Sequence, residues 1–206
     1  MGIVVHHLNN SRSQRVLWML EELGAPYEIV FHKRDLTTNL APPELKAIHP
    51  LGKSPVIVDD GVVIHESGAI LEYLAVKFGK MGYKPGDKEW PLYLQLMHSA
   101  EGSTMLPLML NLYVGRLGEA GAPLQPRIAD ELSNHLGNLD KQLEGKDFLI
   151  GNALTAADIQ NSFAMEFAAM RPGNEFANIS RVVAKWQARP AYRKALEKGG
   201  PYMFAR

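Results

Sequence analysis

The chain begins with short apolar runs that alternate with amphipathic stretches. Four runs predict strands, because each is rich in β-branched or aromatic residues and is bounded by turn residues; they cover residues 3–5, 27–31, 56–58 and 62–64. Around them, apolar residues at helical spacing predict helices that end at Gly24, His49 and Gly79. The order over about the first 80 residues is therefore β-α-β-α-β-β-α.

A βαβ unit followed by a hairpin can build one four-stranded mixed sheet covered by helices. The hairpin is indicated by Asp59-Asp60-Gly61, which lies between the last two apolar runs. We therefore expect an α/β domain of thioredoxin-like architecture over residues 1–81, with the element order βαβαββα.

The second part of the chain changes character after a polar, turn-rich stretch at residues 82–89, which we interpret as a linker. Beyond it, apolar residues at helical spacing predict an all-α helical bundle over residues 90–206. The expected helices cover about residues 90–116, 124–144, 155–170, 179–188 and 190–198. Pro107 lies inside the first of them and should kink or break it, because proline removes a backbone hydrogen bond and crowds the preceding turn.

The charge and hydropathy of the 206 residues narrow the class of function. Lys+Arg and Asp+Glu are equal at 22 each, so the basic excess typical of nucleic-acid binding is missing. No apolar run approaches the roughly 18 residues of a membrane span, and the first residues follow a strand pattern rather than a signal peptide. We expect a cytoplasmic protein without nucleic-acid or membrane partners.

The chain contains no cysteine. This composition excludes disulfides, thiolate metal sites and cysteine nucleophiles. The methionines of the second part lack a histidine cluster at ligand spacing, and His6-His7 are typical of a strand end, so we expect no metal.

The stretch "HPLGKSPVIVDDG" at residues 49–61 is a candidate functional motif. Pro55 stands at the start of a predicted strand, where its missing N–H is tolerated. By itself the motif is explained equally well by a strand-start proline that follows a loop.

Three strings in order give the chain a resemblance to a known family. They are "HPLGKSPVI" at 49–57, "HESGAILEYL" at 65–74 and "LIGNALTAADI" at 149–159. With these spacings, the chain from Ile3 to about Leu196 resembles the cytosolic glutathione transferases. Its start, "HHLNNSRSQRVLWMLEEL", is similar to fungal and bacterial members with a serine/asparagine loop. The resemblance implies glutathione as co-substrate, a hydrophobic electrophile as second substrate, and a homodimer.

The resemblance also implies a glutathione site. Ser54 would pair its backbone with the cysteinyl part of glutathione because the Ser54–Pro55 bond is cis, which X–Pro bonds adopt at a cost of only about 0.5–1 kcal/mol. Ser67 would bind the α-carboxylate at a helix N-terminus, Glu66 the α-ammonium group, and Lys53 the glycyl carboxylate. The plainer alternatives are an N-cap for Ser67 and a solvated loop lysine for Lys53.

The thiol end of the site has more than one candidate. A free thiol has a pKa near 8.5, so its activation requires a donor to the thiolate. Ser11 has the right hydroxyl, although it could instead be only an N-cap. Counting back from Arg15, the position that serine-type members use falls on Asn10, and Arg12 or backbone amides are further alternatives.

The electrophile would lie between the two domains, against the first long helix of the second. Met105, Met109 and Tyr113 are the substrate-pocket candidates, because methionine suits pockets that accept varied shapes. For any single one of them, core packing is the plainer explanation. Thr155 and Asp158 match a capping box, for which we expect a structural role.

The leading functional hypothesis is a transferase that activates the glutathione thiolate for attack on hydrophobic electrophiles. One alternative is glutathione-dependent reduction of disulfides or peroxides, in which the cysteine-free protein would only activate a thiolate. Another is a non-catalytic glutathione-binding partner module. The combination of Lys53, Pro55, Glu66 and Ser67 argues against such a module, because a scaffold needs no glutathione pocket.

Overall fold

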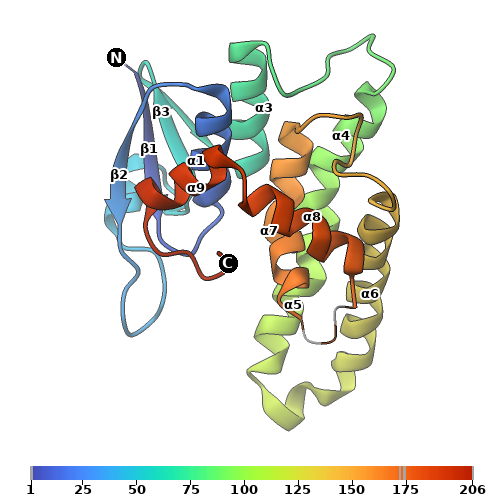
Figure 1. Ribbon diagram of the computed structural model, residues 1–206. Coiled ribbons are helices and arrows are strands. Elements are labelled where there is room, and N and C mark those ends of the chain that lie inside the picture. Colours follow the sequence, from blue (N-terminus) through green and yellow to red (C-terminus); the bar gives the residue numbers. More distant parts are fainter. Residues whose placement is uncertain (1, 172, 174, 206) are drawn as a thin grey trace. The chain divides into compact units, whose positions relative to one another are not determined.

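The computed structural model describes residues 2–171, 173 and 175–205. The chain divides into two compact units (Figure 1). One contains residues 1–82 together with 186–206, and the other contains residues 83–185.

The first unit is built on a four-stranded sheet of order β2-β1-β3-β4. Its strands are β1 (Ile3–Leu8), β2 (Tyr27–His32), β3 (Val56–Asp59) and β4 (Val62–His65). β1 and β2 are parallel, whereas β3 is antiparallel to both β1 and β4. The sheet is therefore mixed, with the predicted hairpin between β3 and β4, and the thioredoxin-like expectation is confirmed.

Helices of this unit bury their apolar faces on the sheet and on each other. They are α1 (Ser13–Leu23), the short α2 (Glu44–Ile48), α3 (Ser67–Phe78) and α9 (Pro190–Gly199). α1 packs on β1 and on α3, and α3 contacts β3 and β4. Val5, Leu17, Ile57 and Leu71 are all fully buried, so the core lies between the sheet and these helices.

The C-terminal residues 186–206 complete the first unit rather than the second. α9 lies along α1, where the Trp18 ring meets the rings of Trp186 and Tyr192 at centroid distances of 6.0 and 5.1 Å. These residues belong to the range 90–206 that the hydrophobic pattern assigns to the helical domain. That division into domains stays a prediction, and the structure adds that the last 21 residues pack with the sheet-containing unit.

The second unit is helical. It contains α4 (Trp90–Ser99), a π-helical turn (Ala100–Thr104), α5 (Met105–Gly115), a 3-10 segment (Gly118–Leu124), α6 (Gln125–Gln142), α7 (Ala156–Ala169) and most of α8 (Ala177–Gln187). The predicted break at Pro107 takes the form of the π-helical turn, which ends shortly before the proline. A wider turn there relieves the crowding between the proline ring and the preceding carbonyl groups.

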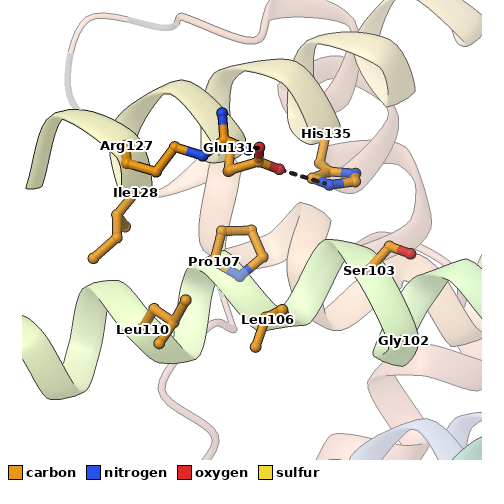
Figure 2. Close-up of a pocket in the computed structure, with 9 residues that line it drawn as sticks. All are labelled: Gly102, Ser103, Leu106, Pro107, Leu110, Arg127, Ile128, Glu131 and His135. Atoms are coloured by element: carbon orange, nitrogen blue, oxygen red, sulfur yellow. Dashed lines mark ion pairs between the residues drawn. The ribbon is translucent and has the colours of Figure 1, made fainter. Parts of the chain in front are cut away.

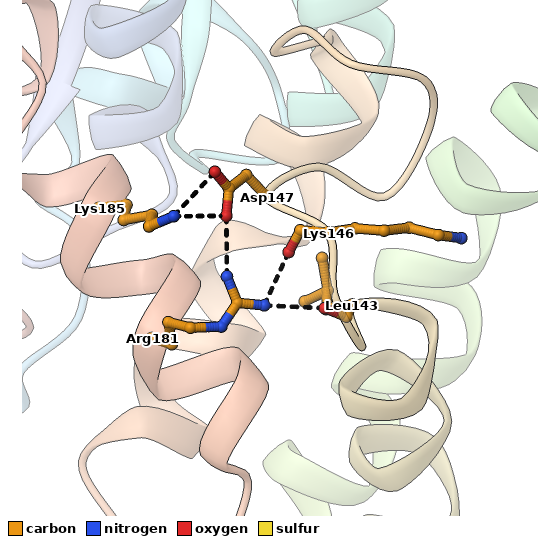
Figure 3. Close-up of polar contacts among 5 residues, drawn as sticks. All are labelled: Leu143, Lys146, Asp147, Arg181 and Lys185. Carbon is orange, nitrogen blue, oxygen red and sulfur yellow. Dashed lines mark hydrogen bonds and ion pairs between the residues drawn. The ribbon is translucent and has the colours of Figure 1, made fainter.

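Two polar clusters hold the irregular segments of the helical unit. The predicted capping box is present, since the Asp158 carboxylate accepts hydrogen bonds from Thr155 N and Oγ1, both at 2.8 Å, and from Leu149 N at 2.7 Å. In the second cluster, Asp147 pairs with Arg181 and Lys185 of α8 (Figure 3). These bonds fix the loop between α6 and α7. None of the helices among the described residues has the length and apolar character that a membrane crossing requires.

Candidate functional site

The predicted binding residues gather at one end of the sheet. The strand register pairs Val56 with both His6 and His65. The end of β1, the start of β3 and the end of β4 therefore lie side by side. The segments next to these strand ends contain the candidates: Asn10 and Ser11 follow β1, Lys53 to Pro55 precede β3, and Glu66 with Ser67 follow β4.

The Ser54–Pro55 peptide bond is cis, as predicted. The Ser54 hydroxyl donates a hydrogen bond of 3.0 Å to the carbonyl of His6 on β1, so its side chain is directed at the sheet. Just before it, Gly52 has φ +58°, and an added Cβ would lie 2.7 Å from Cγ of Lys46. A glycine is thus required in the turn that leads into this segment.

Glu66 and Ser67 begin α3 with an unusual backbone. Glu66 has φ 70° and ψ 118°, a region that residues with a side chain rarely occupy. Such a conformation costs on the order of 1–3 kcal/mol and is found at ligand-binding sites, where the surrounding structure maintains it. The Glu66 side chain is 68% exposed, whereas Ser67 is 3% exposed. The pair thus offers a carboxylate to solvent beside a buried hydroxyl at a helix N-terminus.

Arg15 of α1 also lies at the candidate site, although it was not predicted from the sequence. It is 2% exposed, and its Nη1 donates a hydrogen bond of 3.2 Å to Oγ of Ser67. The buried guanidinium adds its positive charge to the N-terminal end of α3, where the helix dipole already favours an anion. The available signal was a charged residue directly before the apolar positions Val16 and Leu17.

The loop side of the site carries an exposed lysine and a histidine pair. Lys53 is exposed and forms no ion pair within the part of the chain that the structure describes. The ring centroids of His49 and His65 lie 3.9 Å apart with the planes tilted by 31°, and Nδ1 of His65 lies 3.6 Å from the Glu66 carboxylate. These two histidines were not singled out from the sequence, because the loop and β4 meet only in the folded chain.

The serines of the loop after β1 are joined by hydrogen bonds. α1 begins at Ser13, and Oγ of Ser11 accepts a bond of 3.1 Å from the Ser13 N–H. The two hydroxyl oxygens lie 2.7 Å apart, and Oγ of Ser13 lies 2.8 Å from Nδ1 of His7. Ser11 therefore satisfies one N–H at the start of α1 and is also hydrogen-bonded to a buried polar chain.

Asn10 is held from the other side. It has φ 50°, in the left-handed region that asparagine tolerates. Its Oδ1 accepts a bond of 2.8 Å from the Met203 N–H, and its carbonyl accepts one of 3.1 Å from Arg34. With Oδ1 occupied by the C-terminal tail, the amide NH2 group is the part of this side chain that can donate to a ligand.

The substrate-pocket candidates on α5 differ in exposure. Met105 is 3% exposed and belongs to the core, Met109 is half-buried, and Tyr113 is 56% exposed. A cavity of about 390 Å³ lies elsewhere in the helical unit, around Pro107 and the α6 residues Arg127, Glu131 and His135 (Figure 2). Its lining does not include the three candidates, so their role stays a prediction.

Family models match both parts of the chain. The model "Glutathione S-transferase, N-terminal domain" matches residues 1–76, and "Glutathione S-transferase, C-terminal domain" matches residues 92–190. Glutathione S-transferase 3 of Schizosaccharomyces pombe is 39% identical, over 95% of this chain and 87% of the relative. Glutathione S-transferase 1 of Saccharomyces cerevisiae is 32% identical, over 95% and 94%.

Solved structures agree with the sequence relatives. A glutathione S-transferase of Actinobacillus pleuropneumoniae superposes with a TM-score of 0.89 at 31% identity, over 99% of this chain and 96% of the other. A glutathione transferase family member of Pseudomonas fluorescens, solved with two glutathione molecules bound, gives a TM-score of 0.77 at 30% identity, over 95% and 92%.

Proposed function

This chain belongs to the glutathione S-transferase family, and we propose that it activates the glutathione thiol for attack on hydrophobic electrophiles. The main support for this proposal is the geometry at the start of α3. There a buried Ser67 hydroxyl, bonded to Arg15, follows Glu66 in a strained backbone conformation. This arrangement suits the α-amino-acid end of glutathione, which presents a carboxylate and an ammonium group together.

Each end of glutathione has an assigned partner in the proposal. The α3 N-terminus, Ser67 and the nearby Arg15 bind the α-carboxylate, and the exposed Glu66 carboxylate binds the α-ammonium group. The Ser54 backbone pairs with the cysteinyl unit beside cis Pro55. Lys53 binds the glycyl carboxylate, which fits its exposed ammonium group.

At the thiol end, Ser11 is the proposed donor to the thiolate. Lowering a thiol pKa by about two units takes roughly 2.7 kcal/mol of preferential stabilisation of the thiolate. A hydroxyl at the start of α1, next to the positive end of the helix dipole, can contribute to that. Asn10 is the alternative, because its amide NH2 group is oriented by the Met203 contact.

The finer assignments follow from family membership and remain part of the proposal. Met105, Met109 and Tyr113 contribute to the site for the electrophile, with Tyr113 the most exposed of the three. The protein acts as a cytoplasmic homodimer that uses glutathione without a metal.

Reduction of disulfides or peroxides is a second candidate activity. It is favoured by the relative of Pseudomonas fluorescens with two bound glutathione molecules, because a protein without cysteine would need a second thiol to complete the reaction. In that reaction one glutathione thiolate attacks a sulfur of the disulfide, or an oxygen of the peroxide, and expels a thiolate or an alkoxide, which leaves a mixed disulfide or a glutathione sulfenic acid. The second glutathione attacks the glutathione sulfur of that product, expels the remaining substrate thiolate or water, and forms glutathione disulfide.

The test is glutathione binding by calorimetry, followed by assays with a chloronitrobenzene, a hydroperoxide and a glutathione mixed disulfide. We expect binding at millimolar glutathione and turnover of the chloronitrobenzene. Ser67→Ala should weaken binding roughly tenfold through loss of a hydrogen bond to a charged group, while the buried Ser162→Ala serves as a matched control. Absence of binding would contradict both activities, and turnover of only the mixed disulfide would favour the reductase.

A further inference from the structure

His7 is a buried imidazole that the proposed glutathione site does not use. It lies on β1 with 3% of its surface exposed, and the edge of its ring meets Phe31 at a centroid distance of 5.8 Å. Nδ1 lies 2.8 Å from Oγ of Ser13, and the backbone of Gly199 on α9 forms a hydrogen bond with the ring. A buried polar ring with a partner on each nitrogen has a defined orientation.

A continuous chain of short hydrogen bonds connects His7 with the loop that carries Ser11. Nδ1 of His7 pairs with the Ser13 hydroxyl at 2.8 Å, and that hydroxyl pairs with the Ser11 hydroxyl at 2.7 Å. Ser13 is fully buried, and Ser11 is 7% exposed. Each hydroxyl in the chain can both donate and accept, so a proton can pass along it without any heavy atom moving far.

We propose that Ser11, Ser13 and His7 form a proton relay that moves the thiol proton of bound glutathione to Nδ1 of His7. The S–H bond breaks as Ser11 takes that proton, Ser11 passes its own proton to Ser13, and Ser13 passes its own to His7. The products are a thiolate and an imidazolium, so the charge is conserved. This inference rests on the proposed function and on Ser11 as the group beside the sulfur.

The hydrogen bonds along the relay persist in both states, and in each state Ser13 donates to a relay partner instead of to the Leu8 carbonyl, which lies 3.1 Å from its Oγ. Before transfer, Ser11 donates to Ser13 and Ser13 donates to neutral His7, whose other nitrogen donates to the Gly199 carbonyl. After transfer, His7 donates to Ser13, Ser13 to Ser11, and Ser11 to the thiolate. The reversed chain gives Ser11 a stronger hydroxyl donor for sulfur, because an oxygen that accepts a bond donates more strongly.

The surroundings keep His7 neutral until a thiol arrives. Burial lowers the pKa of His7 to about 4, the Gly199 carbonyl opposes this shift, and the titratable His32 on β2 adds to it. Ser13 from α1 and Gly199 from α9 face the ring with uncharged groups. An empty site therefore holds a neutral imidazole. Because a pKa of about 4 lies below that of a free thiol, near 8.5, the imidazolium forms only together with the thiolate at the other end of the relay, whose negative charge stabilises it.

α9 is shaped to make the contact with His7. A Cβ on Gly199 would lie 2.7 Å from Cδ1 of Leu17 and 3.4 Å from Cε1 of His7. A larger residue at this position would make the Leu17 and Gln14 side chains of α1 shift, whereas its distance to His7 would be an ordinary van der Waals contact. Ser13 and His7 thus act through Ser11 as positioning residues and do not touch the thiol.

The test compares Ser13→Ala and His7→Asn with the wild-type protein. Ultraviolet absorbance of the thiolate gives the pKa of bound glutathione, and kcat/KM is measured across pH. In Ser13→Ala we expect the thiol pKa to rise and kcat/KM below that pKa to fall roughly threefold to tenfold, the effect of one lost hydrogen bond. At high pH the rates should converge. His7→Asn keeps a hydrogen-bond acceptor near the Nδ1 position but cannot take up a proton, so the relay predicts the same loss as in His7→Phe, and full recovery in His7→Asn would overturn it.

The outcomes separate the relay from the proposed function. Ser162→Ala, a buried serine of α7 that donates to the Ile159 carbonyl, should leave the pH profile unchanged. A wild-type thiol pKa in a fully folded Ser13→Ala protein would overturn the relay while leaving the transferase activity standing. The same holds if Ser11→Ala leaves the thiol pKa unchanged. Absence of glutathione binding by the wild-type protein would instead contradict the function itself.

Discussion

Glu66 combines a strained backbone conformation with an exposed carboxylate that the proposed site uses for binding. Its φ of 70° directs the peptide groups at the start of α3 and leaves its carboxylate exposed. A residue with a side chain does not adopt this conformation for stability, since glycine would occupy it at no steric cost. In the proposed site, the strained backbone places the Glu66 carboxylate beside Ser67, where it can bind the ammonium group of glutathione.

Glu66→Gly should therefore separate stability from binding. We expect the free energy of unfolding to rise by about 1 kcal/mol through relief of the positive φ, and the dissociation constant of glutathione to rise roughly tenfold through loss of the charged acceptor. Urea denaturation and calorimetry measure the two quantities. Glu66→Ala is the control, since it removes the carboxylate without relieving the strain. Equal stability of the two variants would show that φ is not the source of strain.

Some residues of the proposed site could be predicted from the sequence, and others could not. Lys53, Pro55, Glu66 and Ser67 occur in short motifs, so family resemblance alone singled them out. The partners of Arg15 and His7 lie far along the chain, with Ser67 and Gly199 as examples. No local pattern encodes such contacts, because they form only when α1, α3 and α9 pack against one another.

Among the helices and strands, the main feature that the structure shows beyond the sequence predictions is the packing of α9 on α1. Glu21 and Glu22 of α1 face α9 and its preceding loop, where Glu22 forms bonds of 2.6 and 2.8 Å with Arg189. Glu21 is almost fully buried and pairs with Lys194 and Lys198. These ion pairs hold the C-terminal helix against α1, which begins after the loop that carries Asn10 and Ser11.

Glu21 should make the stability of this packing depend on pH. Burial alone would raise the pKa of its carboxyl group, but hydrogen bonds from Lys194, Lys198 and Tyr27 lower it to about 2. Because this value lies below that of the unfolded chain, the stabilisation is present above about pH 4.5 and is lost as pH falls towards 2. We expect on the order of 2 kcal/mol to be lost over this range.

Urea denaturation between pH 7 and pH 2 tests this expectation. Glu21→Gln should be less stable than the wild type at pH 7, and the two proteins should approach each other in stability near pH 2. Glu175→Gln is the control, since Glu175 forms an exposed pair with Arg171 and such pairs contribute little. A difference between Glu21→Gln and the wild type that stays constant with pH would contradict the assigned pKa.

For the molecule as a whole, the hydrophobic pattern predicted the fold class because strands and helices have different periods. The order of elements then left few possible sheets, and the parallel and antiparallel pairings follow from short connections. The pattern could not predict that residues 186–206 join the sheet-containing unit, because an amphipathic helix does not specify which apolar face it covers. That packing brings Gly199 and Met203 to the loop of Asn10 and Ser11.

We propose that glutathione binds at this end of the sheet with its sulfur beside Ser11, and a crystal structure of the protein with glutathione is the decisive experiment. We predict the γ-glutamyl carboxylate on Ser67, the cysteinyl backbone paired with Ser54, and the sulfur within hydrogen-bond distance of the Ser11 hydroxyl. A sulfur that contacts only the amide of Asn10, or glutathione bound away from Ser54 and Ser67, would show that the proposed site is wrong.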